Sequence, residues 1–192
     1  MKLTQLSTAI YEKLYADITQ FRETFDLACA APETLDDKAD ELHTSLIIEE
    51  LTELAEAPCK VEQADAIVDS VYVLMGRLVH LGDTKVEDNL AISYLIDLFL
   101  NVAKQRKIDF ITCWDEVHSS NMSKVCRNQQ EYTDTVAFYA KQGVTLTESI
   151  KGEFIIAKCA EDVQMESKLV RKGKVLKSVY YRPADLAPLV NL

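Results

Sequence analysis

The chain has 192 residues, of which 48% are hydrophobic and 27% are charged. This composition is typical of a globular protein and excludes a disordered or fibrous chain. The net charge of −10 comes from one stretch, because residues 33–69 hold 12 acidic residues and 2 lysines, whereas the other 155 residues carry 19 acidic and 19 basic side chains. We therefore expect no nucleic acid polymer as a partner, since net charge gives no attraction to a phosphate backbone.

The cysteines and the start of the chain indicate the compartment. Five widely spaced cysteines without a Cys-x-x-Cys pair predict neither a disulfide framework nor a zinc site, and favour a reducing, intracellular and hence cytoplasmic location. Residues 1–21 carry Glu12 and Asp17 within their apolar pattern, so we expect neither a signal peptide nor a membrane span there.

Apolar residues recur every three to four positions over most of the chain, which predicts amphipathic helices. The predicted helices span about residues 3–28, 35–57, 61–80, 86–104, 109–126 and 129–142. After Gly143 the period changes, and residues 143–149 and 153–159 read as short strands, followed by a hairpin in 168–181 that turns at 172–173. We expect a mainly α fold, a bundle of about six helices with a small C-terminal antiparallel β appendage.

Two neighbouring helices of this bundle carry acidic residues on one face each. The first has the pattern Glu-Glu-x-x-Glu, and the second has acidic residues at positions i, i+3 and i+7. The six residues are Glu49, Glu50 and Glu53 on the first helix, and Glu62, Asp65 and Asp69 on the second. Because only a tight link at Pro58 joins the helices, they should pack antiparallel with these faces opposed.

Crowded carboxylates repel one another, and a divalent cation would remove that cost. Oxygen-only ligands suit Mg²⁺ or Mn²⁺, and magnesium commonly completes its shell with water and substrate phosphates. The competing interpretation is an ordinary solvated helix face, which an isolated Glu-Glu-x-x-Glu usually is. The second acidic face, embedded in apolar sequence, favours the metal site. The remaining acidic residues of the stretch fit a surface role: Glu33, Asp36, Asp37, Asp40, Glu41 and Glu56.

Four segments resemble the all-α NTP pyrophosphohydrolases, which comprise MazG, dimeric dUTPases and phosphoribosyl-ATP pyrophosphohydrolases. They are IIEELTELAEA, EQADAIVDSVYVLMGRLVHLG, FITCWDEVHSSNMSK and GKVLKSVYYRPADLAPLV. The pattern is most similar to the phosphoribosyl-ATP pyrophosphohydrolase-like branch of bacteria and phages. The resemblance implies one MazG-like catalytic domain over 1–192, with 126–171 an insertion of helix and β-hairpin. That insertion could cap the site, extend a dimer interface or carry a partner-binding surface.

The resemblance implies Mg²⁺-dependent (or Mn²⁺-dependent) hydrolysis between the α- and β-phosphates of a (deoxy)nucleoside triphosphate, giving monophosphate and pyrophosphate, for instance in dUTP or dNTP pool control. Glu49, Glu50 and Glu53 match the first metal motif, with Glu50 as a candidate general base. The second motif is ambiguous: Glu62 and Asp65 fit its letters, whereas Asp69 fits its register. The implied substrate-binding residues are Asn121, Lys124, Lys174, Lys177 and Tyr181.

Three alternatives stay open at this point. The chain could be a non-catalytic helical module with an acidic binding face, or a phosphoribosyl-ATP pyrophosphohydrolase, and the lysines of residues 168–182 could be a solvated hairpin edge. The resemblance implies a homodimer or a dimer of dimers, and the apolar helix at 86–104 favours at least a homodimer here. Trp114 and His43 fit buried helix positions better than base-binding roles. Base and sugar specificity do not follow from the sequence.

Overall fold

The computed structural model describes residues 2–164, 169–170 and 172–190. They divide into two compact units, which are described separately. Unit 1 comprises Met1–His118 and Asp185–Leu192, and unit 2 comprises Ser119–Ala184. Unit 2 thus contains the residues of the expected insertion at 126–171. The chain passes from unit 1 into unit 2 after His118 and returns to unit 1 at Asp185.

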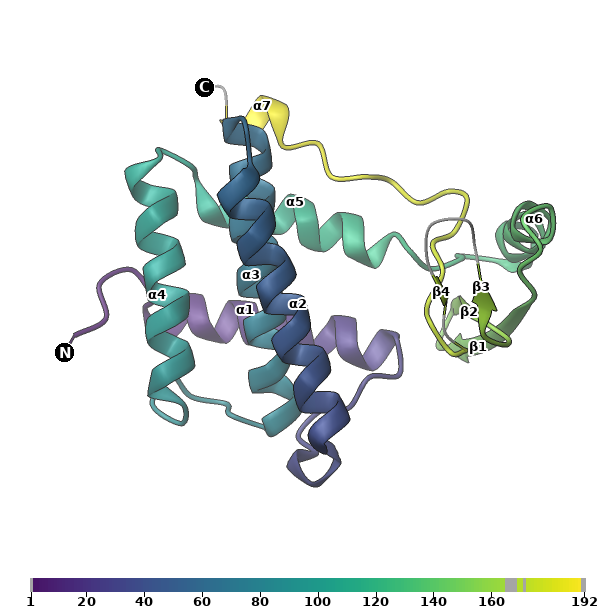
Figure 1. Cartoon of the computed structure of the whole chain (residues 1–192), viewed down its shortest axis with the longest axis horizontal. Coiled ribbons are helices and arrows are strands. Elements are labelled where there is room, and N and C mark those ends of the chain that lie inside the picture. The colour runs from purple at the N-terminus through teal and green to yellow at the C-terminus, as the bar shows by residue number, and fades with distance from the viewer. Residues whose placement is uncertain (1, 165–168, 171, 191–192) are drawn as a thin grey trace. The chain divides into compact units, whose positions relative to one another are not determined.

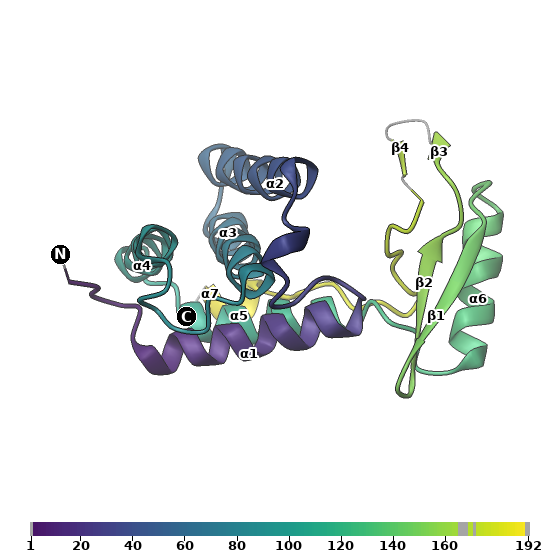
Figure 2. The ribbon, with the colours of Figure 1, turned by 90° about the horizontal axis from the view of Figure 1, so that it is seen from below.

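Unit 1 is helical, as Figures 1 and 2 show. Its elements are α1 (Thr8–Thr24), the short 3₁₀ helix η1 (Pro32–Thr34), α2 (Asp37–Glu56), α3 (Lys60–Leu81), α4 (Leu90–Gln105), most of α5 (Phe110–Met122) and α7 (Ala187–Val190). The predicted mainly α class is confirmed, and each long helix lies within a few residues of its predicted range.

The helix ends follow capping chemistry. Ser7, Asp36 and Asn89 precede α1, α2 and α4, and each side chain accepts a hydrogen bond from the backbone N–H three residues on. Helix α3 ends at Gly82, whose φ of 81° is left-handed and whose N–H donates to the Leu78 and Val79 carbonyls. These caps place the start of α2 and the end of α3, which fixes the hairpin that carries the acidic residues.

Helix α3 is the centre of unit 1, with α1, α2 and α4 packed around it. Most of its residues from Ala64 onward are buried, which explains its high apolar content. Trp114 of α5 is fully buried, and its Nε1 donates to Asp17 Oδ2 at 2.8 Å. The prediction that Trp114 belongs to the core is confirmed.

The N-terminal segment is anchored by a carboxylate of α4. Asp97 is buried, and its oxygens accept hydrogen bonds from the backbone N–H groups of Thr4, Gln5 and Leu6 at 2.6–3.1 Å. Helix α1 therefore begins at Thr8 and not near residue 3 as predicted, because residues 4–6 use their N–H groups to bind Asp97.

Unit 2 contains α6 (Gln129–Ala140) and four short strands, β1 (Leu146–Lys151), β2 (Phe154–Cys159), β3 (Val163–Gln164) and β4 (Leu169–Val170). Strands β1 and β2 form the expected antiparallel hairpin, and β2 packs on α6. The C-terminal arm was predicted wrongly. Its two halves do not form one hairpin, because β4 pairs with β3, whereas Lys174–Leu176 bonds to β2 through Cys159 N to Lys174 O and Leu176 N to Ala157 O.

All five cysteines are free thiols, and three of them are buried. None of the helices in the described part of the chain is long and apolar enough to cross a membrane.

Candidate metal and nucleotide site

The acidic residues lie on the α2–α3 hairpin, which the two helices form through a short link at Pro58. Arg77 of α3 forms an ion pair with Asp40 near the start of α2 and ties the two helices together at that end. Although α2 packs on α3, none of its 20 residues is fully buried. The helix therefore has faces available beyond the one in contact with α3.

Glu50 lies at the centre of the acidic residues. Its Oε2 is buried and is one of only two buried side-chain polar atoms without a hydrogen-bond partner among the described residues. Burial, followed by the nearby charge of Asp69 and then by Glu53, Glu49 and Asp65, raises the pKa of Glu50 to about 7. Glu50 on α2 therefore lies close enough to the acidic residues of α3, Asp69 above all, for their charge to act on it.

The three acidic residues of α3 differ in their surroundings. Asp69 is half-buried and is the charge that acts most strongly on Glu50, which favours the family register over the Glu-x-x-Asp letters. Asp65 is exposed by area, yet desolvation and then the charge of Glu62 raise its pKa. Glu62 is exposed, as are Glu49 and Glu53 on α2.

The donor set fits a hard divalent cation in its chemistry. It is oxygen-only, anionic, and includes a buried carboxylate oxygen that lacks a partner. Within the described residues, however, no three His, Cys, Asp or Glu side chains already converge closely enough to hold a metal ion. The exposed carboxylates would therefore have to rotate inward when a cation binds. Metal binding by Glu49, Glu50, Glu53, Glu62, Asp65 and Asp69 stays a prediction.

An apolar cavity of about 150 Å³ lies among α1, α2 and α3, one to two helical turns from Glu50 and Asp69. Its walls include Phe21, Tyr72 and Leu46, and the rings of Phe21 and Tyr72 meet edge to face at 5.4 Å between centroids. On α2, the cavity residue His43 precedes Glu50 by seven positions and so lies on the same side, about 10 Å along the axis. On α3, the cavity residue Val73 follows Asp69 by one turn, or about 6 Å.

Two basic side chains border this cavity, and both have internal partners. His43 Nε2 lies 3.2 Å from His80 Nδ1, and His80 Nε2 lies 2.8 Å from Thr34 Oγ1. Burial, followed by the charge of Arg22, lowers the pKa of His43 to about 4, so this histidine is neutral at physiological pH. The buried Arg22 donates from Nε to the Ala28 carbonyl at 2.7 Å. The prediction that His43 is a partly buried helix residue is confirmed.

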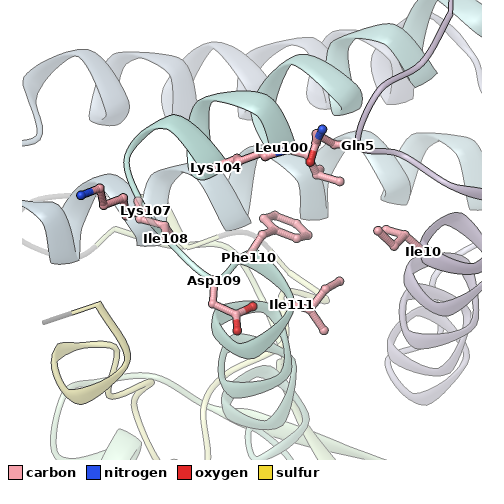
Figure 3. A pocket seen from close by; sticks show the side chains of 9 residues that line it. All are labelled: Gln5, Ile10, Leu100, Lys104, Lys107, Ile108, Asp109, Phe110 and Ile111. Atoms are coloured by element: carbon pink, nitrogen blue, oxygen red, sulfur yellow. The ribbon is translucent and has the colours of Figure 1, made fainter. Parts of the chain in front are cut away.

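A larger cavity, about 410 Å³, lies elsewhere in unit 1. Figure 3 shows Phe110 and Ile111 between Ile10 on one side and Lys107 on the other, with the Lys107 side chain pointing away from them. It contains none of the six carboxylates, and its only acidic residue is Asp109. Volume alone therefore does not identify the candidate site. The smaller cavity is the better candidate, because it lies within one or two helical turns of Glu50 and Asp69.

The predicted substrate-binding residues all lie in unit 2, and four of them form two contacting pairs, Asn121 with Lys124 and Lys177 with Tyr181. Lys124 Nζ donates to Asn121 Oδ1 at 2.7 Å, Lys177 Nζ lies 4.3 Å from the centre of the Tyr181 ring, and Tyr181 Oη accepts from Ser120 at 3.1 Å. Lys174 is exposed. These contacts hold Asn121, Lys124, Lys177 and Tyr181 in place, and their role in binding substrate stays a prediction.

The cavity beside Glu50 was not predicted from the sequence. Its residues come from three helices, and most of them read as ordinary core positions. One signal was present in Arg22, which follows Ile18 by four positions on the apolar face of α1. A charged side chain at a buried helix position is uncommon and marks a polar partner or a cavity.

Comparison with known proteins agrees with this geometry. Residues 18–87 match the model of the phosphoribosyl-ATP pyrophosphohydrolase family. The matched segment holds all six carboxylates and every residue that lines the 150 Å³ cavity. No curated protein and no solved structure gives a significant match. Residues 18–87 thus constitute a phosphoribosyl-ATP pyrophosphohydrolase family domain, of the MazG-like all-α NTP pyrophosphohydrolase superfamily.

Proposed function

We propose that this protein is a Mg²⁺-dependent (or Mn²⁺-dependent) nucleotide pyrophosphohydrolase that cleaves a (deoxy)nucleoside triphosphate between its α- and β-phosphates. The family domain implies nucleotide pyrophosphohydrolase-like activity. The observation that carries the finer proposal is the buried, unpartnered Oε2 of Glu50, surrounded by carboxylates and one or two helical turns from an apolar cavity. A metal-bound polyphosphate needs carboxylates that hold its cations, and an organic ring needs an apolar cavity. Unit 1 offers both, the carboxylates around Glu50 and the cavity one or two helical turns away.

Each group of residues has a proposed role in the hydrolysis. Glu49, Glu53 and Asp69, with Glu62 and Asp65 as further candidates, would hold the cations. When bound, the cations would neutralise charge on the phosphate oxygens and position a water for in-line attack. Glu50 is the candidate general base, because its buried oxygen has no competing partner and could accept a proton from a water held beside it. The apolar wall of the cavity would exclude bulk water from the adjacent end of the substrate.

The cavity favours a pyrimidine over a purine. An apolar cavity of about 150 Å³ is large enough for one six-membered ring such as benzene. The aromatic walls can contact a ring edge to face or by stacking, and the neutral His43 and the Arg22 side chain supply polar groups at the border. A pyrimidine substrate is consistent with control of the dUTP or dNTP pool.

In unit 2, Lys124, Lys174 and Lys177 are proposed to take phosphate charge, and Asn121 and Tyr181 to bind base or sugar. Their amide, hydroxyl and ammonium groups suit an anionic nucleotide. This proposal is supported by the contacts that hold the side chains of Asn121, Lys124, Lys177 and Tyr181 in place.

The experiment is a substrate panel. Phosphate release is measured with malachite green and added pyrophosphatase, for all NTPs and dNTPs, with Mg²⁺, Mn²⁺ or EDTA. We expect turnover with metal only and a preference for pyrimidine nucleotides. Glu50→Gln and Asp69→Asn should each reduce kcat at least ~100-fold, the usual scale for general-base catalysis, whereas Glu41→Gln on an exposed part of α2 should keep full activity. Absence of turnover by the wild type would contradict the proposal.

Phosphoribosyl-ATP is the second candidate substrate, because the matching family model is the one named for its hydrolysis. It enters the same panel as a further compound. A larger kcat/KM for phosphoribosyl-ATP than for any dNTP would select this alternative and exclude pool control as the main role.

We also propose a homodimer, or a dimer of dimers, located in the cytoplasm. Helix α4 exposes a stripe of apolar residues that includes Leu95 and Leu98, 47% and 57% exposed, and α2 exposes Ile48 and Leu51. Apolar stripes of this kind are unfavourable in water and are typical of subunit interfaces.

A further inference from the structure

Unit 2 contains a cavity of its own, with a volume of about 360 Å³. It lies among the end of α5, the start of α6, the first residue of β2 and the segment that contains Tyr180 and Arg182. This volume falls within the range of small-molecule sites, about 300–1,000 Å³. None of the residues proposed for metal or substrate binding lines it.

Two arginines and one carboxylate, that of Glu131, line this cavity, so its lining is net positive in a chain with a net charge of −10. Arg127 is held by the buried Glu131, whose Oε1 accepts from Nε at 2.9 Å and lies 2.7 Å from Nη2. The second oxygen of Glu131 accepts from the Arg127 backbone N–H at 2.8 Å. These bonds fix the guanidinium and leave Nη1 without a partner among the described residues, so Nη1 can donate to a ligand.

The second arginine of the lining, Arg182, is held by two serines. Arg182 Nη2 donates to Ser119 Oγ at 2.8 Å, and its backbone N–H donates to Ser123 Oγ at 3.0 Å. Ser123 itself lines the cavity. Two pre-oriented guanidinium groups in the lining of one cavity suit a phosphate group, which arginine binds through its N–H donors.

The remaining wall is aromatic and apolar. Phe154 and Tyr180 line it, together with Met122 and Val125. The Tyr180 hydroxyl donates to Asp134 Oδ2 at 2.8 Å, which fixes the position of its ring. Flat aromatic surfaces of this kind stack on planar rings, and stacking accepts any base.

We propose that unit 2 binds a nucleoside monophosphate in this cavity, with the phosphate between Arg127 and Arg182 and the base against Phe154 and Tyr180. Neither the carboxylates nor a divalent cation takes part. The site is thus separate from the proposed catalytic function and stands if that function fails.

Calorimetric titration of the full chain with AMP and UMP in EDTA tests the proposal. We expect saturable binding of both nucleotides, weaker binding of inorganic phosphate and none of adenosine. Arg182→Gln should weaken AMP at least ~10-fold, equivalent to one lost charge-assisted hydrogen bond. Phe154→Leu should weaken AMP and leave inorganic phosphate unchanged. The control Lys141→Gln, an exposed lysine after α6, should bind like the wild type.

Amide NMR shifts locate the ligand without relying on a variant. AMP should shift Ser123, Arg127 and Phe154, and Glu50→Gln should bind AMP normally. The proposal is overturned if the wild type binds no nucleotide in EDTA, if folded Arg182→Gln binds with full affinity, or if the shifts fall on α2 and α3 instead. Circular dichroism of each variant separates loss of binding from loss of fold.

Discussion

Replacing Glu50 by glutamine should stabilise the metal-free protein at pH 8 while reducing its kcat at least ~100-fold. In the folded chain, burial and then Asp69 hold the pKa of Glu50 at about 7, compared with an ordinary value of 4.5. A carboxylate with a raised folded pKa stabilises the protein in its protonated form. That contribution is complete below pH 4.5, falls as the pH rises, and is lost above about pH 7.

The magnitude follows from the same numbers. At about 1.4 kcal/mol for each tenfold change in proton affinity, the rise from 4.5 to about 7 sets a ceiling of about 3 kcal/mol. Glu50 is only half-buried, so solvent screening should reduce the cost of its charge to about 1–2 kcal/mol. Glutamine keeps the shape, carries no charge, and should recover that amount.

The assay is urea unfolding in EDTA between about pH 5 and pH 8, with the wild type, Glu50→Gln and Glu41→Gln compared at each pH. His43 gives the wild-type curve an opposite slope, because its lowered pKa makes the fold less stable below its ordinary value of 6.5. The informative quantity is therefore the difference between variant and wild type. This difference should grow with pH for Glu50→Gln and stay flat for Glu41→Gln. Equal behaviour of the two variants would refute the electrostatic reasoning, and added Mg²⁺ should restore the wild type more than Glu50→Gln.

Three further outcomes follow from other parts of unit 1. Asp97→Asn should cost about 2–3 kcal/mol in urea unfolding, because a buried carboxylate loses charge-assisted bonds to three backbone N–H groups; an unchanged midpoint would show that this anchor is not stabilising. Leu98→Glu should convert the proposed dimer into a monomer in light scattering, whereas Lys104→Glu on the same helix should not; a dimer in both would exclude this face as the interface. Gly82→Ala should lower the unfolding free energy by about 1–2 kcal/mol, because its φ of 81° is strained for alanine and a Cβ would lie 3.2 Å from Ala30 Cα; thermal unfolding measures this, and no loss would argue against the left-handed cap.

Local pattern was enough to predict the helices, and long-range contacts explain the differences. The periodicity of α3 and α4 and the caps at Asp36 and Gly82 are properties of neighbouring residues, so they can be read from the chain. The start of α1 depends on Asp97, more than 90 residues away, and no local signal reveals that bond. The arm after residue 172 also depends on a distant partner, because it pairs with β2 and not with the preceding strand.

The same division applies to the site. The six carboxylates were predictable because spacing on a helix fixes which side chains share a face. The different burial of these six side chains could not be predicted in this way, because the buried Oε2 of Glu50 and the nearby cavity result from how α1, α2 and α3 pack. The unit 2 cavity likewise joins Arg127 to Arg182 across more than 50 residues.

The hydrogen bond from Asp185 N–H to Glu116 Oε1, 3.1 Å long, has a consequence for how this protein can vary. Both residues belong to unit 1, so the chain re-enters unit 1 beside the point where it leaves, and Lys60 then binds the Val190 carbonyl at 2.6 Å to fasten the C-terminal end. Unit 2 is therefore inserted at a closed junction, where length can be gained or lost without opening the core of unit 1. Evolution could exchange the whole of 119–184 for another module, and with it the proposed nucleoside monophosphate site and the proposed substrate-binding residues, while the carboxylate hairpin stays intact.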